Sequence, residues 1–413
     1  MYNQINNFIS KNNILYKFQY GFQENTSTET AVSEISELIS NKIDNKDLTC
    51  AVFIDLKKAF DTVNHNILIN KLNYYGIRGI SSKLIKNYLT NRTQITTVNG
   101  KKSTSGKITC GVPQGSILGP LLFLLYINDL PNFSNFDIRL FADDACLIYN
   151  SKNPLTLQDK ANFELNKINN WMNKNKLSIN YEKSNYIIFT NKRNKFKFNI
   201  HMNNVKLDQV KQTKYLGVIL QENLKWNQHV EYIRTKVSRS CYILSKIRHF
   251  VDKDTSRMLY YSLIHNHLNY CISSWGGSSK SVLDPLIKLQ KKAIRFISHS
   301  AYDSHTKPLF NNLRIMNLHN IYNFNVVIAL YKIINNNKTA NSNSLLNLTN
   351  LHSHNTRLSS GQNFYQNFNR TNIGKTTYTT QGIRFWRQLP TKFKSMSLQV
   401  FKFKTKKYIL DNQ

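Results

Sequence analysis

Two adjacent carboxylates, Asp143 and Asp144, stand between two largely apolar runs at residues 138–141 and 145–149. This pattern predicts two short strands joined by a tight turn that carries both acids. Because neighbouring like charges repel and Asp is a poor strand former, the pair is unfavourable for stability and suits the binding of a divalent cation. Taken alone, the pair also fits a solvated turn, since Asp is a common turn residue.

A third carboxylate, Asp55, directly follows the apolar run 50–54, which predicts a buried strand. The residues after it, 56–61, are predicted to begin a helix. An acid at the carboxyl end of a strand lies where sheet proteins commonly build their sites. This second acidic position favours the interpretation of Asp143 and Asp144 as cation ligands over that of a solvated turn.

Between the two acidic positions, residues 110–120 combine three glycines with two prolines, and an apolar run follows at 121–127. Such a loop permits a ligand to approach the backbone closely, and the apolar run predicts a buried helix. The side-chain amide of Gln114 can donate a hydrogen bond to a phosphate or a sugar, and the N-terminus of a helix offers free N–H groups to an anion.

The composition indicates a polyanionic partner. The chain has 56 Lys and Arg residues against 23 Asp and Glu residues, which gives a formal charge of +33 and a pI of about 9.9. Basic residues interleaved with Tyr, Phe and Trp offer both phosphate contacts and stacking surfaces, so a nucleic acid is the expected partner.

Other classes of protein are disfavoured by the sequence. The longest apolar run, 121–127, is too short to span a bilayer, and the first residues lack the pattern of a secretory signal, so no membrane association is expected. The five cysteines show no paired short spacing. Neither a disulfide framework nor a zinc site is expected, and the cysteines are predicted to be reduced and mostly buried.

The second half of the chain is predicted to be mainly helical. Residues 226–250 carry apolar side chains at helical spacing with basic residues on the other faces. A further helical region is expected from 254 to 330, with breaks near Gly276 and Pro308. Residues 335–350 are polar and rich in Asn, which predicts a linker.

Three motifs in order, at 53–61, 111–120 and 141–144, closely resemble the reverse transcriptases of non-LTR retrotransposons, particularly the jockey-like elements. Residues 177–184 resemble the palm motif that follows in this family, and 215–219 resemble its primer-grip hairpin. Upstream, the segment Gln-Tyr-Gly-Phe-Gln that begins at Gln19 resembles the end of the fingers subdomain.

The resemblance implies an α+β fold, in which a right-hand polymerase palm with partial fingers is followed by a helical thumb and a C-terminal extension. The implied domains are partial fingers at 1–48, palm at 49–222, helical thumb and connection at 223–334, an Asn-rich linker at 335–350, and a small basic C-terminal module at 351–413.

The implied activity is that of an RNA-directed DNA polymerase, which transfers a nucleotide to a primer 3′-hydroxyl with two divalent ions. In this family the acid after the first palm strand and the acidic pair on the hairpin bind these ions, so Asp55, Asp143 and Asp144 are the expected catalytic and metal-binding residues. Oxygen ligands suit Mg²⁺ or Mn²⁺. The expected partners are an RNA template, a DNA primer and deoxynucleoside triphosphates.

The resemblance also assigns residues around the nucleotide and the primer. Phe60 falls where the family places an aromatic ring that would collide with a 2′-hydroxyl, and Lys183 lies where it could protonate the departing pyrophosphate. Phe60 could equally serve core packing, and Lys183 could be a solvated charge. The expected nucleotide-binding residues are Leu56, Phe60, Gln114, Gly115 and Lys183, and the expected primer grip is Tyr215, Leu216 and Gly217.

Two departures from the family pattern bear on activity. Gln23 stands where family members usually have Arg, which removes a charge expected to meet the triphosphate. The chain also begins only about 20 residues before that motif, so it is expected to be an N-terminally truncated form of a longer ancestral protein. A catalytically silent nucleic-acid-binding remnant is therefore an alternative, and a group II intron-type reverse transcriptase is another. The resemblance to the family suggests that the protein is located in the nucleus or in a cytoplasmic ribonucleoprotein. The sequence does not indicate the oligomeric state.

Overall fold

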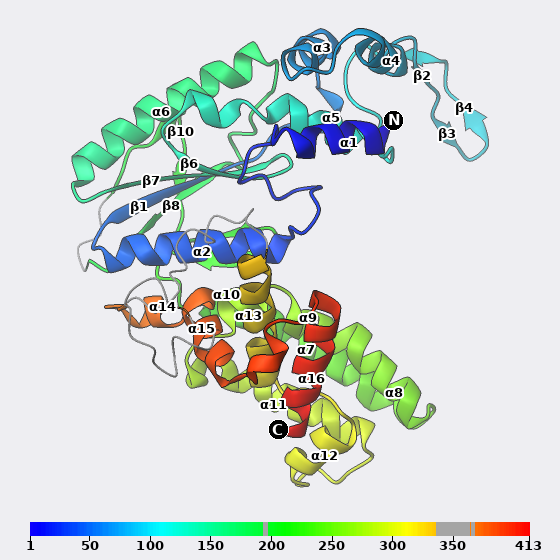
Figure 1. Ribbon diagram of the computed structural model, residues 1–413, viewed down its shortest axis with the longest axis vertical. Coiled ribbons are helices and arrows are strands. Elements are labelled where there is room, and N and C mark those ends of the chain that lie inside the picture. Colours follow the sequence, from blue (N-terminus) through cyan, green and yellow to red (C-terminus); the bar gives the residue numbers. More distant parts are fainter. Residues whose placement is uncertain (193–196, 336–363, 365–367) are drawn as a thin grey trace. The chain divides into compact units, whose positions relative to one another are not determined.

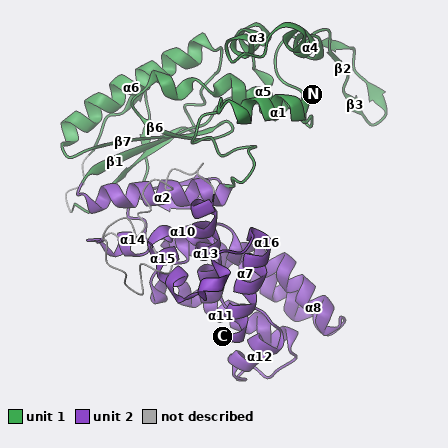
Figure 2. Cartoon of the chain, viewed as in Figure 1, with its two compact units in different colours: residues 1–27, 47–211 green, residues 28–46, 212–413 purple. Residues whose placement is uncertain are grey.

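The computed structural model describes residues 1–192, 197–335, 364 and 368–413. The chain divides into two compact units, which Figure 2 distinguishes by colour: unit 1 comprises residues 1–27 and 47–211, and unit 2 comprises residues 28–46 and 212–413. Each unit is a set of residues that contact one another more than they contact the rest of the chain. The division into fingers, palm and thumb stays a prediction. Apart from Asn335, the predicted linker at 335–350 lies outside the described residues.

Unit 1 combines a central sheet with helices (Figure 1). Its elements in chain order are α1 (Tyr2–Lys11), β1 (Leu48–Ile54), the 3₁₀ turn η1 (Ala59–Asp61), α3 (His65–Tyr74), α4 (Gly79–Leu89), β2 (Thr93–Gln94), β3 (Thr97–Val98), β4 (Lys101–Lys102), β5 (Gly106–Lys107), α5 (Leu118–Ile127), the 3₁₀ turn η2 (Leu130–Phe133), β6 (Asp137–Phe141), β7 (Asp144–Ser151), α6 (Pro154–Lys174), β8 (Asn185–Phe189), β9 (His201–Met202), β10 (Val205–Lys206) and β11 (Asp208–Gln209).

The central sheet of unit 1 has five strands in the order β11-β8-β1-β7-β6. Strand β1 lies in the middle and pairs antiparallel with β7 on one side and β8 on the other. All seven residues of β1 are buried, as the uninterrupted apolar run predicted. Asp55 therefore follows β1, and the acidic pair lies at the start of β7, the strand beside it.

One face of this sheet packs against helices of the same unit. Val52, Leu140 and Leu147 point to this face and share a core with apolar residues of α5 and α6, the helices that Figure 1 shows beside the sheet. Helix α5 is apolar all round and buried from Leu121 to Ile127, as the apolar run predicted. The cysteines are all free, and Cys110 alone among the five is exposed, which agrees with their predicted state.

Unit 2 is mainly helical. Its elements in chain order are α2 (Thr28–Asp44), β12 (Gln212–Tyr215), β13 (Val218–Gln221), α7 (Asn227–Ile247), α8 (Lys253–Tyr260), the π-helical turn η3 (Tyr261–His265), α9 (Asn266–Asn269), α10 (Ile272–Trp275), α11 (Lys280–Ile297), α12 (Thr306–Asn312), α13 (Leu318–Asn335), α14 (Asn372–Lys375), α15 (Tyr378–Gln388), the 3₁₀ turn η6 (Thr391–Phe393) and α16 (Leu398–Asp411).

Two features of unit 2 bear on the sequence predictions. Helix α7 buries Val230, Ile233 and Val237 on one face, as the periodicity predicted. The breaks expected near Gly276 and Pro308 are confirmed: residues 276–279 separate α10 from α11, residues 298–305 separate α11 from α12, and Pro308 itself is the third residue of α12. A proline in the first turn of a helix removes no intrahelical hydrogen bond, so the helix tolerates it there. No helix in the described ranges is long and apolar enough to cross a membrane.

Candidate active site

The ladder between β1 and β7 places Asp55 opposite Asp144. The last paired residues of these strands are Ile54 and Ala145, so Asp55 and Asp144 occupy the next positions of the same register. Residues directly opposite each other in an antiparallel pair present their side chains on one face of the sheet. Two carboxylates that are distant in the sequence therefore meet at one end of the sheet.

The third carboxylate, Asp143, lies in the turn that joins β6 to β7. Phe141 and Asp144 are the last pair of this hairpin, and Ala142 and Asp143 form the connection between them. Ala142 has a φ of 55°, in the left-handed region that two-residue hairpin turns require. The prediction of a strand–turn–strand element that carries both acids is confirmed.

The motif at 177–184 holds Asp55 in place. Asn180 donates a hydrogen bond from Nδ2 to Asp55 Oδ2 at 3.0 Å, and the Asp55 backbone N–H donates to Ser184 Oγ at 3.2 Å. Ser184 Oγ in turn donates to the backbone oxygen of Asn180 at 2.8 Å. Asn180 and Ser184 were missed as site residues, although both lie inside a motif that the sequence had marked.

The electrostatics of the three acids show uncompensated negative charge. Burial, together with the nearby carboxylates of Asp143 and Asp55, raises the pKa of Asp144 to about 6. Burial also raises the pKa of Asp143, with Asp55 contributing. The cation beside them, Lys183, lies 4.0 Å from Asp55 Oδ2, and its side chain is 72% exposed. Such a pair gives little compensation.

This arrangement fits a hard divalent cation by its donor chemistry. Carboxylate oxygens are the ligands that Mg²⁺ and Mn²⁺ prefer, and a cation would relieve the repulsion that raises the pKa of Asp144. In the part of the chain that the structure describes, no three His, Cys, Asp or Glu side chains are grouped closely enough to hold a metal ion by themselves, and this includes the three acids. Mg²⁺ is usually held by one or two carboxylates together with water and substrate phosphates, so an open site of this kind suits it.

A second group of predicted residues surrounds η1. The helix expected to begin at 56–61 is wrong: only Ala59–Asp61 form a 3₁₀ turn. Leu56 pairs as a β-bridge with Ile179, and Lys58 has a left-handed φ of 48°, so the backbone cannot enter an α-helix there.

Phe60 lies within this turn, and Gln114 contacts it. Phe60 is half-buried and stacks on Phe123 of α5 with ring centroids 4.5 Å apart. Gln114 Nε2 donates a hydrogen bond to Asp61 Oδ1 at 2.8 Å. The backbone N–H of Val112 donates to the oxygen of Phe60 at 2.8 Å, which fixes the glycine-rich loop against the turn.

Leu56 and Gly115, which are also predicted to bind the nucleotide, differ in their exposure to solvent. The side chain of Leu56 is buried in the core, so only its backbone can face a ligand. Gly115 is exposed, has a φ of 76°, and no atom lies within 4 Å of where its Cβ would stand. A ligand can therefore approach the backbone at Gly115, as the loop composition predicted.

The predicted primer grip belongs to unit 2. Tyr215 and Val218 close the β12–β13 hairpin, and Leu216 and Gly217 form its turn with φ values of 45° and 79°. Tyr270 Oη donates a hydrogen bond to the backbone oxygen of Leu216 at 2.8 Å. The predicted hairpin is confirmed, while the role of these residues in holding a primer stays a prediction.

The chain is similar in sequence to curated RNA-directed DNA polymerases. The chain is 28% identical to a probable RNA-directed DNA polymerase from the transposon X-element of Drosophila melanogaster, over 72% of this chain and 33% of that protein. It is 27% identical to the RNA-directed DNA polymerase from the mobile element jockey of the same species, over 73% of this chain and 34% of that protein. The chain thus spans about a third of the length of these curated relatives. Among solved structures, a telomerase from Candida albicans aligns with a TM-score of 0.42 and 12% identity, over 76% of this chain and 58% of that chain.

A family model decides the assignment. The model described as reverse transcriptase (RNA-dependent DNA polymerase) matches residues 1–220, which is more than half of the chain and includes all three acids. The resemblance to jockey-like elements that the motifs indicated is confirmed by the relatives. The chain belongs to the reverse transcriptase (RNA-dependent DNA polymerase) family.

Proposed function

We propose that this chain catalyses RNA-directed DNA synthesis, in which a deoxynucleotide is added to the 3′-hydroxyl of a DNA primer on an RNA template. The observation that carries the proposal is the position of Asp55 opposite Asp144, one residue beyond the last pair of β1 and β7, with Asp143 in the turn between β6 and β7. Membership of the reverse transcriptase family supports it. A nucleus or cytoplasmic ribonucleoprotein location is proposed from the family alone.

In this proposal the three carboxylates hold divalent Mg²⁺ or Mn²⁺. When bound there, the ions supply Lewis-acid stabilisation of charge on the phosphoryl oxygens and lower the pKa of the primer hydroxyl. The raised pKa of Asp144 supports this role, because burial and the neighbouring carboxylates make its negative charge costly, and a bound divalent cation would compensate that charge.

The other residues of the site act on the nucleotide. The bond from the primer oxygen to the α-phosphorus forms as the bond to pyrophosphate breaks, and the proton of the primer hydroxyl passes to water. In this proposal Lys183 gives the departing oxygen a proton, which its exposed position 4.0 Å from Asp55 Oδ2 supports. Phe60 presents its ring toward the sugar, and Gln114, oriented by Asp61, donates its amide to the nucleotide. Backbone approach at Gly115 completes the pocket.

The proposal is tested by primer extension. The purified chain is incubated with a primed RNA template, deoxynucleoside triphosphates and Mg²⁺, beside the variant Asp143→Asn/Asp144→Asn, which keeps the shape of the turn. We expect extension by the native chain and a loss of about 100-fold or more in the variant. If the native chain binds the template–primer in a salt-dependent way but extends nothing, it is a silent nucleic-acid-binding remnant.

The choice of deoxynucleotides is tested at Phe60. Phe60→Ala should raise ribonucleotide incorporation relative to deoxynucleotide incorporation by about 10-fold, because the steric barrier to a 2′-hydroxyl is removed. Phe22→Ala serves as a control, since Phe22 touches the edge of the Phe60 ring at 6.2 Å between centroids and is itself exposed. If an active Phe60→Ala variant keeps the same selectivity for the sugar, Phe60 only packs in the core and does not exclude ribonucleotides.

A further inference from the structure

A segment far from the acids in sequence lies alongside the hairpin that carries them. Gln19 forms a parallel β-bridge with Leu140 of β6. The backbone N–H of Tyr20 donates to the oxygen of Leu140 at 2.8 Å, and the N–H of Leu140 donates to the oxygen of Phe18 at 3.0 Å. Residues 18–20 therefore extend the sheet for a short distance beside β6 and end next to its turn.

The side chain of Gln19 reaches the turn itself. Its Oε1 accepts a hydrogen bond from the backbone N–H of Ala142 at 2.9 Å and a second from the N–H of Gly21 at 2.9 Å. Gln19 is 2% exposed and Ala142 is 3% exposed, so water does not replace this acceptor readily. The amide that Gln19 satisfies belongs to the residue with left-handed φ, immediately before Asp143.

Close packing restrains the same turn. A Cβ at Gly21 would stand 2.5 Å from the backbone N of Ala142 and 3.1 Å from its Cβ. Glycine is therefore required at this position, because no side chain fits between the two backbones. The hydrogen bond from Ala142 and the contact at Gly21 together leave the turn little freedom to move.

We propose that Gln19 is a positioning residue for the acidic turn, which fixes residues 142–144 so that Asp143 and Asp144 present their carboxylates to the divalent cation. The inference rests on the proposed function and adds to it a residue that touches neither the metal nor the substrate. Partners that orient metal ligands typically change metal affinity by 10- to 100-fold when removed.

The test replaces Gln19 by Met, which has a similar length but no oxygen acceptor. Mn²⁺ binding to the chain without nucleic acid is measured by electron paramagnetic resonance of the free ion, and template–primer affinity is measured separately. We expect Gln19→Met to weaken Mn²⁺ binding by about 10-fold and to leave template–primer affinity unchanged. Equal Mn²⁺ binding by the variant and the native chain would overturn the inference.

Gln158→Met is the matched control. Gln158 Oε1 also accepts a hydrogen bond from a backbone N–H, that of Asn199 at 2.8 Å, but it lies on α6, which carries none of the three acids. This variant loses the same kind of contact and should bind Mn²⁺ as the native chain does. If both variants lose Mn²⁺ affinity equally, the effect of Gln19 is general destabilisation and the inference is wrong.

A measurement on the native chain covers the case in which Gln19→Met does not fold. Hydrogen exchange of the Ala142 amide should be as slow as that of Ala145 in β7, because Gln19 occupies it. Rapid exchange at Ala142 would overturn the inference. Failure of the proposed function is distinguishable, since the native chain would then not extend primers whatever the Mn²⁺ and exchange results.

Discussion

Unit 1 contains two clusters of charge that differ in how completely they are neutralised. In the first, Lys71 Nζ lies 2.5 Å from Asp129 Oδ1 and donates a hydrogen bond to the backbone oxygen of Tyr126 at 2.7 Å. The rings of Tyr126 and Trp171 flank the same ammonium group, with centroids at 5.1 Å and 4.6 Å. In the second, which comprises Asp55, Asp143 and Asp144, the exposed Lys183 Nζ lies 4.0 Å from Asp55 Oδ2.

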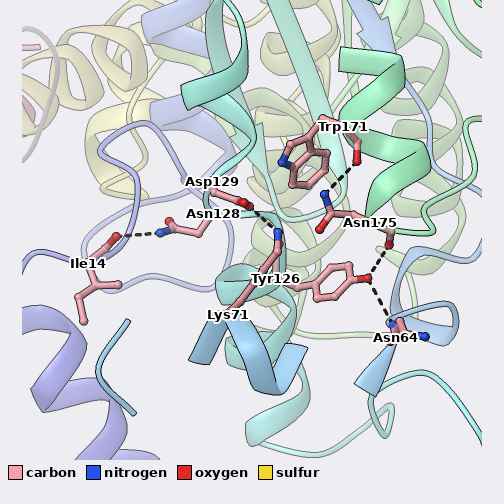
Figure 3. A network of polar contacts seen from close by, with 8 residues as sticks. All are labelled: Ile14, Asn64, Lys71, Tyr126, Asn128, Asp129, Trp171 and Asn175. Atoms are coloured by element: carbon pink, nitrogen blue, oxygen red, sulfur yellow. Dashed lines mark hydrogen bonds and ion pairs between the residues drawn. The ribbon is translucent and has the colours of Figure 1, made fainter. Parts of the chain in front are cut away.

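Several hydrogen bonds surround the Lys71–Asp129 pair, as Figure 3 shows, although the buried Trp171 Nε1 has no hydrogen-bond partner among the described residues. Tyr126 Oη donates to the backbone oxygen of Asn175 at 2.5 Å, and Asn128 Nδ2 donates to the backbone oxygen of Ile14 at 2.8 Å. This cluster connects α3, α5 and α6 with the chain after α1. We infer that a charge neutralised by a partner within the protein stabilises the fold, whereas a cluster of charges without such a partner is available to bind a ligand.

The largest expected effect on stability comes from breaking the matched cluster. Lys71→Met leaves the Asp129 carboxylate partly buried without its cation, so we expect the free energy of unfolding to fall by about 3 kcal/mol. Urea unfolding followed by circular dichroism measures this. The double variant Lys71→Met/Asp129→Asn should recover a substantial part of the loss, because no charge is then left unpaired. If Lys71→Met leaves the free energy of unfolding nearly unchanged, the Lys71–Asp129 pair does not stabilise the fold and the two clusters do not differ in this respect.

The unmatched cluster should respond in the opposite direction. In the folded chain the pKa of Asp144 is about 6, against an ordinary value of 3.8. The folded state therefore binds more protons between these values, and stability falls as the pH rises through that window. The difference corresponds to roughly 3 kcal/mol, which solvent screening of this half-buried carboxylate reduces to about 1 kcal/mol.

Asp144→Asn should accordingly raise the free energy of unfolding by about 1 kcal/mol at pH 8 without metal, and the gain should vanish below pH 4. Urea midpoints of both proteins from pH 4 to pH 8 measure the difference. Mg²⁺ should then stabilise the native chain more than the variant, since it binds the folded carboxylates. A variant that is less stable than the native chain at pH 8 would show that the acids are already neutralised.

The smallest expected effect on stability concerns Lys183. Because this side chain is 72% exposed and 4.0 Å from Asp55, Lys183→Gln should change the free energy of unfolding by less than about 0.5 kcal/mol. If Lys183 donates a proton to pyrophosphate, the rate of single-nucleotide addition falls by about 100-fold at the same time. An unchanged rate in rapid-quench experiments would show that Lys183 is a solvated charge. The three acids would then have no cationic side chain with a role in the reaction.

The parts of the site that follow from local pattern were predicted from the sequence. An apolar run that ends in an acid predicted β1 and Asp55, and the two apolar runs on either side of the acidic pair predicted the hairpin, because strand and turn preferences act over a few residues. The stretch 56–61 was predicted wrongly since its backbone is fixed by pairing with Ile179, a contact that local preference does not encode.

The residues that sequence reasoning missed act across long separations. Gln19 contacts a turn 123 positions away, and Asn180 holds an acid 125 positions away. Lys71 and Asp129 each look like ordinary surface charges until α3 and α5 are packed. Their roles depend on tertiary contacts, which composition and periodicity do not reveal.

Because Asp55 and Asp144 meet through the register of a ladder, their spatial proximity does not depend on how many residues separate them in the chain. Residues 91–107, which form the exposed hairpin between β2 and β5, could lengthen or shorten without disturbing the ladder. One residue added within β1 or β7 would instead turn an acid to the opposite face, since side chains alternate along a strand. Diverging copies of this chain are therefore expected to vary in length at 91–107 and to keep both strands unchanged in length.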